Sequence, residues 1–72
     1  MSKMNLKEIV LHRGYNHHWI NFEYPSEEKF TEQDAKEAQR KLDYDPAGYG
    51  FYDFRYDRRE KTYFWRCSAY TD

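Results

Sequence analysis

The chain contains a single cysteine among its 72 residues, so Cys67 has no partner for an internal disulfide and no second thiolate for a zinc cluster. No apolar run approaches the roughly 18 residues that a transmembrane helix requires. The opening stretch MSKMNLKEIV also lacks the hydrophobic segment of a secretory signal. We therefore expect a cytoplasmic protein that does not act at a membrane.

Charge of one sign is not in excess either. The 12 Lys and Arg residues stand against 13 Asp and Glu residues, which gives a formal net charge of −1. Such a balance provides no overall attraction to nucleic acid or to an anionic membrane surface. Any binding of a polyanion would need a local basic patch.

Aliphatic residues are scarce, with only six Leu, Ile and Val residues, at positions 6, 9, 10, 11, 20 and 42. Aromatic residues make up 21% of the chain, against 39% for all hydrophobic residues together. A chain this short must bury most of its large apolar side chains to offset its conformational entropy. The sequence therefore predicts one domain spanning residues 1–72, with an aromatic-rich core and a flexible segment at residues 1–5.

The N-terminal part of the chain predicts a β-hairpin. Residues 7–13 form a short apolar run that ends at a segment with turn character, residues 14–16. Apolar and polar side chains alternate in the next run, residues 17–24, which places the even-numbered residues on one face of a strand. Pro25 ends this strand because it lacks a backbone N–H.

A helix is predicted from Glu32 to Asp43. Thr31 caps its N-terminus, and Asp34 three residues later completes a variant of the capping box. The apolar stripe of this helix consists of Ala35, Ala38 and Leu42. Because two of these residues are alanines, the helix is expected to pack close to a sheet. Residues 45–50, which contain Pro46 and two glycines, are predicted to break the helix and reverse the chain.

A second hairpin follows, formed by residues 51–57, a charged turn and residues 62–70. In the first strand, alternation places Tyr52, Phe54 and Tyr56 on one face, opposite Phe51, Asp53 and Arg55. In the second strand, Tyr63, Trp65, Cys67 and Ala69 lie opposite Phe64, Arg66 and Ser68. The predicted fold is α+β with element order ββαββ, a four-stranded antiparallel sheet with one helix packed on one face.

Residues typical of catalysis or metal binding do not form a recognised pattern. His12, His17 and His18 belong to the first hairpin, but adjacent strand residues point to opposite faces, so His17 and His18 do not share an ion. No catalytic signature surrounds Cys67, and AGYG lacks the Lys and Ser or Thr of a phosphate-binding loop. The sequence therefore predicts no enzymatic activity, no cofactor and no metal.

The second hairpin is the strongest candidate for a binding surface. Because one helix covers only one sheet face, we expect some members of a set of six aromatic residues to be exposed or to contact a partner or a second copy. The set is Trp19, Tyr49, Phe51, Tyr52, Phe64 and Tyr70. Tyr, Trp and Arg are typical of protein-binding hot spots. The predicted partner-binding residues are Tyr49, Tyr52, Arg55, Arg58, Arg59, Phe64 and Arg66.

Two alternatives to a protein partner stay open. Aromatic residues interleaved with arginines are also typical of proteins that bind single-stranded nucleic acid, although the acidic residues Asp53, Asp57 and Glu60 neutralise much of this patch. A homodimer formed through an uncovered sheet face or a strand edge is the second alternative.

The segment TEQDAKEAQRKLDYDPAGYGFYDFRYD, followed by TYFWRCSAYTD, resembles the αββ half of small phage-encoded accessory proteins, including inhibitors of the anti-CRISPR type. The resemblance covers size, order of elements and aromatic content over about residues 30–72. It implies a stoichiometric inhibitor that docks on a larger host complex, often one that handles nucleic acid. No functional residue is carried over from it.

Overall fold

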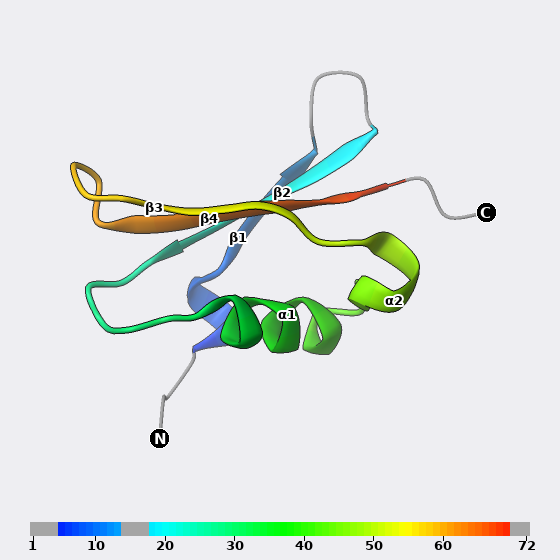
Figure 1. The fold of residues 1–72 in the computed structure, drawn as a ribbon, viewed down its shortest axis with the longest axis horizontal. Coiled ribbons are helices and arrows are strands. Elements are labelled where there is room, and N and C mark those ends of the chain that lie inside the picture. Colours follow the sequence, from blue (N-terminus) through cyan, green and yellow to red (C-terminus); the bar gives the residue numbers. More distant parts are fainter. Residues whose placement is uncertain (1–4, 14–17, 70–72) are drawn as a thin grey trace.

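The computed structural model describes residues 5–13 and 18–69, in which a four-stranded antiparallel sheet is covered on one face by helices (Figure 1). The strands are β1 (Val10–Arg13), β2 (Trp19–Pro25), β3 (Tyr52–Asp57) and β4 (Thr62–Ser68). The helices are α1 (Glu32–Lys41), the single turn α2 (Pro46–Tyr49) and a 3-10 turn η1 (Leu6–Glu8). The predicted α+β class and the four-stranded antiparallel sheet with one main helix are confirmed.

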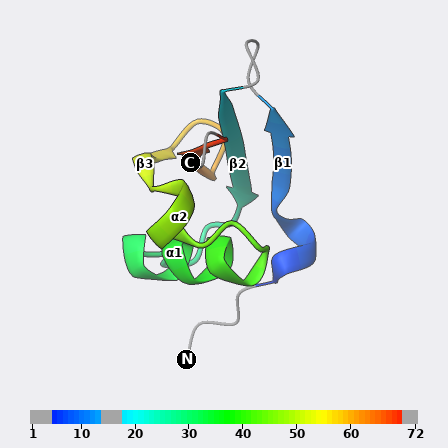
Figure 2. The same cartoon turned by 90° about the vertical axis from the view of Figure 1, so that its right-hand side faces the viewer.

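Strand order in the sheet is β1-β2-β4-β3, so that β2 and β4 are central and β1 and β3 form the edges. β1 and β2 run side by side in opposite directions (Figure 2), and the two hairpins join where β2 pairs with β4. In this central pair Phe22 lies opposite Trp65, and Ile20 lies opposite Cys67. Directly opposite residues share a face, so these four side chains all point toward the helices.

Helix α1 begins as the sequence predicts. The Thr31 hydroxyl oxygen accepts a hydrogen bond from the Asp34 backbone N–H at 3.2 Å, while Asp34 Oδ2 accepts one from the Thr31 backbone N–H at 2.9 Å. The helix ends at Lys41 rather than at the predicted Asp43, because Asp43 has a φ of 75° and left-handed geometry ends a helix.

The predicted break at residues 45–50 contains a helical turn that was not expected. The Asp45 side chain accepts a hydrogen bond from the Ala47 backbone N–H, and Pro46 occupies the first position of α2. Gly50 then adopts a φ of 82°, and a Cβ at this position would lie 2.6 Å from the Tyr52 ring. Glycine is therefore required here both for its backbone conformation and for the close approach of Tyr52.

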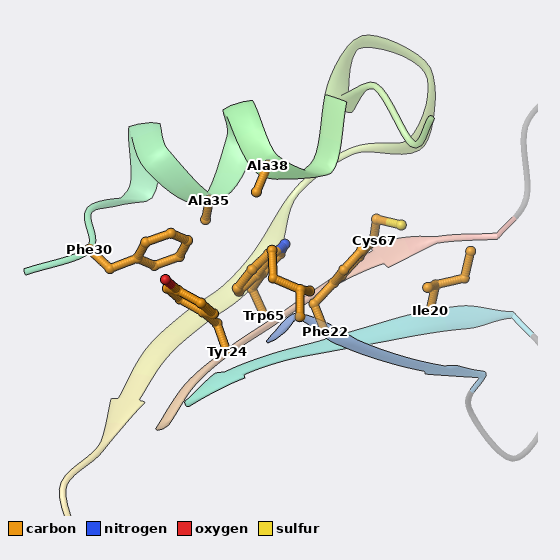
Figure 3. Close-up of a cluster of buried hydrophobic side chains, with 9 residues drawn as sticks. Ile20, Phe22, Tyr24, Phe30, Ala35, Ala38, Trp65 and Cys67 are labelled. Atoms are coloured by element: carbon orange, nitrogen blue, oxygen red, sulfur yellow. The ribbon is translucent and has the colours of Figure 1, made fainter. Parts of the chain in front are cut away.

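The core between α1 and the sheet is largely aromatic, as the composition predicts (Figure 3). Trp65, which is 2% exposed, stacks nearly parallel to Phe22 with ring centroids 5.1 Å apart. Phe30 closes one end of this stack against Tyr24, at 4.7 Å. The helix contributes Ala35 and Ala38, both fully buried. Small side chains on α1 leave room for the large rings of the sheet.

One fully buried polar residue, Gln39, ties the helical segments to the sheet. Its side-chain amide nitrogen donates hydrogen bonds to the backbone carbonyls of Tyr44 and Gly50, each at 2.7 Å. Its amide oxygen accepts a hydrogen bond from Trp65 Nε1–H at 3.2 Å. Burial of this amide is therefore compensated by three partners.

Simple alternation in β3 holds from Phe54 to Tyr56 but is wrong for Tyr52. The pairing with β4 shifts register between Tyr52 and Arg55, and Asp53 has a φ of 57°, which identifies a β-bulge. The extra residue places Tyr52 and Arg55 on the same face, opposite Arg66 and Phe64. Phe54 and Tyr56, predicted to share a face with Tyr52, instead contact the Tyr63 ring on the side of the helices.

Several predicted features lie outside the described residues, namely residues 1–4 of the flexible segment, the turn at residues 14–16, His17 and Tyr70. Within the described ranges, no helix has the length and apolarity needed to cross a bilayer.

Candidate functional site: the open face of the sheet

No helix of the described chain covers the sheet face opposite α1, which we call the open face (Figures 1 and 2). Strand register arranges its side chains in two rows that each cross all four strands. The first row contains His12, Asn21, Arg66 and Tyr52, and the second contains Val10, Glu23, Phe64 and Arg55. Residues within a row are cross-strand neighbours and are close enough to interact.

Trp19, at the start of β2, anchors one end of the open face. The guanidinium carbon of Arg66 lies 4.1 Å from the centroid of the Trp19 ring, within the range of a cation–π interaction. Tyr52 meets the same indole edge-on, with centroids 5.5 Å apart. Trp19, Arg66 and Tyr52 therefore form one cluster contributed by β2, β4 and β3.

Arg66 also has an acidic neighbour at the bulge. Its Nε atom lies 2.6 Å from Asp53 Oδ2, but the N–H does not point at this oxygen well enough to make a hydrogen bond. The contact is therefore an ion pair that compensates the charge of Arg66. The left-handed backbone of Asp53 places its carboxylate at this position.

A second stacked guanidinium belongs to Arg55, whose guanidinium carbon lies 4.6 Å from the centroid of the Phe64 ring. Arg55 and Phe64 are directly opposite residues on β3 and β4. Among the ion pairs of the described residues, none involves Arg55. Arg55 is thus held by a ring and, within residues 5–13 and 18–69, its charge has no acidic partner.

On the β1 side, His12 Nε2 lies 2.5 Å from Glu23 Oε2 across the strand pair. Glu23 is the only acidic side chain of the second row, at the position facing Phe64 on the next strand. Each cationic or imidazole side chain of the two rows other than Arg55 therefore has a carboxylate beside it.

These side chains border a shallow hollow of about 600 Å³ on the open face. The residues that line it are the polar His12, Asn21, Glu23, Asp53, Arg55 and Arg66 and the aromatic Phe22, Phe54, Phe64 and Trp65. A hollow lined by aromatic residues, two guanidinium groups and two carboxylates is suited to binding a polar group of a ligand by charge-assisted hydrogen bonds.

The structure brings together four of the seven residues predicted to bind a partner. Tyr52, Arg55, Phe64 and Arg66 lie on the open face. Tyr49 instead belongs to α2 and packs edge-on against Tyr44 at 5.2 Å, on the side of the helices. Arg58 and Arg59 are exposed in the turn between β3 and β4.

Sequence reasoning missed His12, Asn21 and Glu23 as members of this site. Alternation along β2 had placed Asn21 and Glu23 opposite the apolar face, but it did not show that β2 pairs with β4. Only the register of that pairing brings them next to Phe64 and Arg66.

Within residues 5–13 and 18–69, neither a reactive thiol nor a cluster of metal ligands belongs to this face. Cys67 lies on the opposite side of the sheet, the covered face, on which α1 packs, and it is fully buried. Burial raises the pKa of its thiol to about 11. A thiol with such a pKa is protonated and unreactive near neutral pH. In the part of the chain that the structure describes, no three His, Cys, Asp or Glu side chains are placed to hold a metal ion.

Comparison with known proteins yields no matching family model, no matching curated protein and no matching solved structure.

Proposed function

We propose that this protein is a non-enzymatic interaction module that docks a partner protein on the open face of its sheet. The observation that carries the proposal is the gathering of Trp19, Tyr52 and Phe64 with two stacked arginines on the face opposite α1. Aromatic and arginine side chains dominate binding hot spots because they offer large, rigid contact areas with a polar end. Tyr52 is 45% exposed although it is a large aromatic residue, so a partner would bury considerable surface there.

Single-stranded nucleic acid is the alternative occupant, and the same geometry argues against it. A base stacks on the face of an aromatic ring, but Arg66 already occupies one face of Trp19 and Arg55 one face of Phe64. Phosphates bind cations that lack a counter-ion, and Asp53 compensates Arg66. These contacts favour a protein partner.

The resemblance to small phage-encoded accessory proteins supports a more specific proposal about the role of this module. A module of this size without catalytic groups would act stoichiometrically, by occupying a surface of a larger complex. An inhibitor or adaptor encoded by a mobile element and acting in the cytoplasm is the role that fits this mode of action.

The test compares two tyrosines of the same strand that lie on opposite faces. Tyr52 is on the open face and 45% exposed, whereas Tyr56 is 39% exposed and contacts Tyr63 on the side of the helices. Tagged wild-type protein, Tyr52→Ala and Tyr56→Ala are used to purify bound proteins from a lysate of the source organism, with quantitative mass spectrometry. We expect a partner that wild type and Tyr56→Ala retain and Tyr52→Ala loses, by at least about tenfold.

Arg58→Glu in the β3–β4 turn serves as a second control for a change of surface charge. A partner retained equally by all three variants, or lost equally from all three, would contradict docking on the open face. Binding of a labelled single-stranded oligonucleotide that decreases steeply with added salt would instead support the nucleic-acid alternative.

A further inference from the structure

The two stacked arginines of the open face differ in one respect that points to the chemistry of the partner. Both guanidinium groups lie over aromatic rings, Arg66 at 4.1 Å from Trp19 and Arg55 at 4.6 Å from Phe64. Arg66 has a carboxylate, Asp53, at 2.6 Å, whereas Arg55 has none among the described residues. We propose that Arg55 binds a carboxylate group supplied by the partner protein, an inference that rests on the proposed docking surface.

Stacking on Phe64 holds the guanidinium group of Arg55 in a position to bind a carboxylate. A guanidinium group that lies on a ring uses one of its faces, while its N–H donors lie in the plane of the group and stay available for hydrogen bonds. A carboxylate matches these donors with two parallel hydrogen bonds. Because Phe64 already restricts the arginine side chain, less conformational entropy is lost when the carboxylate binds.

The surroundings of Arg55 favour a single carboxylate over a chain of phosphates. Arg55 lines the same hollow as Asp53 and Glu23, so a ligand with several negative charges would meet repulsion from both acidic side chains. One side-chain carboxylate adds a single charge, which Arg55 compensates. A phosphate group forms the same kind of hydrogen bonds with a guanidinium group as a carboxylate does. The acidic side chains near Arg55 nevertheless favour a protein segment with one carboxylate over a chain of phosphates.

Apolar neighbours restrict the partner segment further. Phe64 on β4 is the direct cross-strand neighbour of Arg55, and Val10, which is 50% exposed, ends the same row beyond Glu23. An acidic residue flanked by apolar side chains would therefore contact Arg55 and cover this row. The partner segment that fits is an apolar stretch with one Asp or Glu.

The experiment titrates the isotope-labelled full chain with blocked peptides and follows backbone amide and arginine Nε–Hε signals by NMR. The probe is acetyl-Ala-Phe-Glu-Phe-Ala-amide, and the matched control replaces Glu by Gln, which removes only the charge. We expect the Glu peptide to shift the Arg55 Nε–Hε signal and the open-face amides, with affinity roughly fivefold higher than that of the Gln peptide. Arg55→Gln should abolish this preference, and Arg40→Gln, on the exposed side of α1, should leave it unchanged.

Each other outcome overturns the inference in a recognisable way. Equal binding of both peptides on the open face would contradict a carboxylate site while supporting the docking surface. Tighter binding of an oligothymidylate than of the Glu peptide would identify a phosphate site and contradict both proposals. If no peptide shifts the Arg55 signal at millimolar concentration, Arg55 is not a carboxylate site, and the purification with Tyr52→Ala decides the docking surface separately.

Discussion

On the covered face of the sheet, Trp65 stacks on Phe22 at 5.1 Å and donates its indole N–H to buried Gln39, whereas on the open face Trp19 lies half-buried beneath the guanidinium of Arg66. The first tryptophan is surrounded by other rings and by α1. The second contacts a cation and the edge of Tyr52. The same residue type thus has apolar neighbours on one face and charged neighbours on the other.

This difference gives the two faces of the sheet different roles, with the covered face stabilising the fold and the open face available for binding. Burial of apolar area is the main favourable term in folding, and the covered face supplies most of it in this chain. Cation–π contacts at exposed sites contribute only about 0.5–1 kcal/mol each. Variants of the open face should therefore change binding while leaving the protein folded, and variants of the covered face should unfold it.

The largest expected effect comes from comparing the two tryptophans, the only ones in the chain. Trp65→Ala should lower the free energy of unfolding by about 3–5 kcal/mol, because it opens a large cavity beside Phe22 and removes a hydrogen bond. A core of this size rarely supplies more than roughly 3–5 kcal/mol in total, so we expect this variant to be unfolded. Trp19→Ala should cost about 1–2 kcal/mol, the sum of one cation–π and one edge-to-face contact.

Far-UV circular dichroism without denaturant shows whether Trp65→Ala is folded, and urea unfolding measures the free energy of unfolding of Trp19→Ala. Each variant retains the other tryptophan, whose fluorescence reports on its own face of the sheet. Equal destabilisation by the two substitutions would contradict the division between a stabilising face and a binding face.

A smaller loss of stability is expected from substitution of Gln39. Its side chain hydrogen-bonds Trp65 on the covered face and the backbone of the segment that leads into β3. Gln39→Leu removes the acceptor of Trp65 Nε1–H and the donor to the carbonyls of Tyr44 and Gly50. Buried groups left without partners cost about 1–3 kcal/mol, so we expect a loss of about 2–3 kcal/mol in the free energy of unfolding.

Gln33→Leu is the matched control for this substitution, because Gln33 is exposed on the same helix. It should change the free energy of unfolding by no more than about 0.5 kcal/mol. Thermal and urea unfolding of the two variants provide the measurement. A stable Gln39→Leu variant would show that the buried amide does not hold α2 to the sheet.

The covered face was largely predictable from the sequence. Its signals are local ones, such as alternation along β2 and β4, the capping box of Thr31 and Asp34, and the two alanines of α1. Each depends only on neighbours within a few residues, so one strand or helix carries it entirely. Gln39 is the exception, because a glutamine in a helix gives no indication that its amide is buried.

The open face was less predictable, since it depends on register and on a bulge. Simple alternation placed Tyr52 with Phe54, and the left-handed residue Asp53 reversed that arrangement. Asp is among the few residues other than glycine that adopt this conformation, but it does so too rarely for the sequence alone to indicate a bulge. Arg66 and Trp19 are far apart in the sequence, and only the β2–β4 pairing brings them into contact.

The smallest expected effect concerns the ion pair that distinguishes Arg66 from Arg55. Asp53→Asn removes the charge beside Arg66 and retains a residue type that tolerates positive φ, so the bulge should persist. Both partners are substantially exposed, and we therefore expect a loss of at most about 1 kcal/mol in the free energy of unfolding. The loss should shrink between about 0.01 M and 1 M salt, because salt screens exposed charges.

Asp43→Asn is the matched control, since Asp43 also has a positive φ, of 75°, and takes part in none of the ion pairs of the described residues. Asn suits the left-handed position after a helix, and removing a negative charge there relieves repulsion with the helix dipole, so this variant should be unchanged or slightly more stable. Urea unfolding of both variants at the two salt concentrations isolates the ion pair. If Asp53→Asn behaves like Asp43→Asn under both conditions, Asp53 does not compensate Arg66, and the contrast that assigns the carboxylate site to Arg55 disappears.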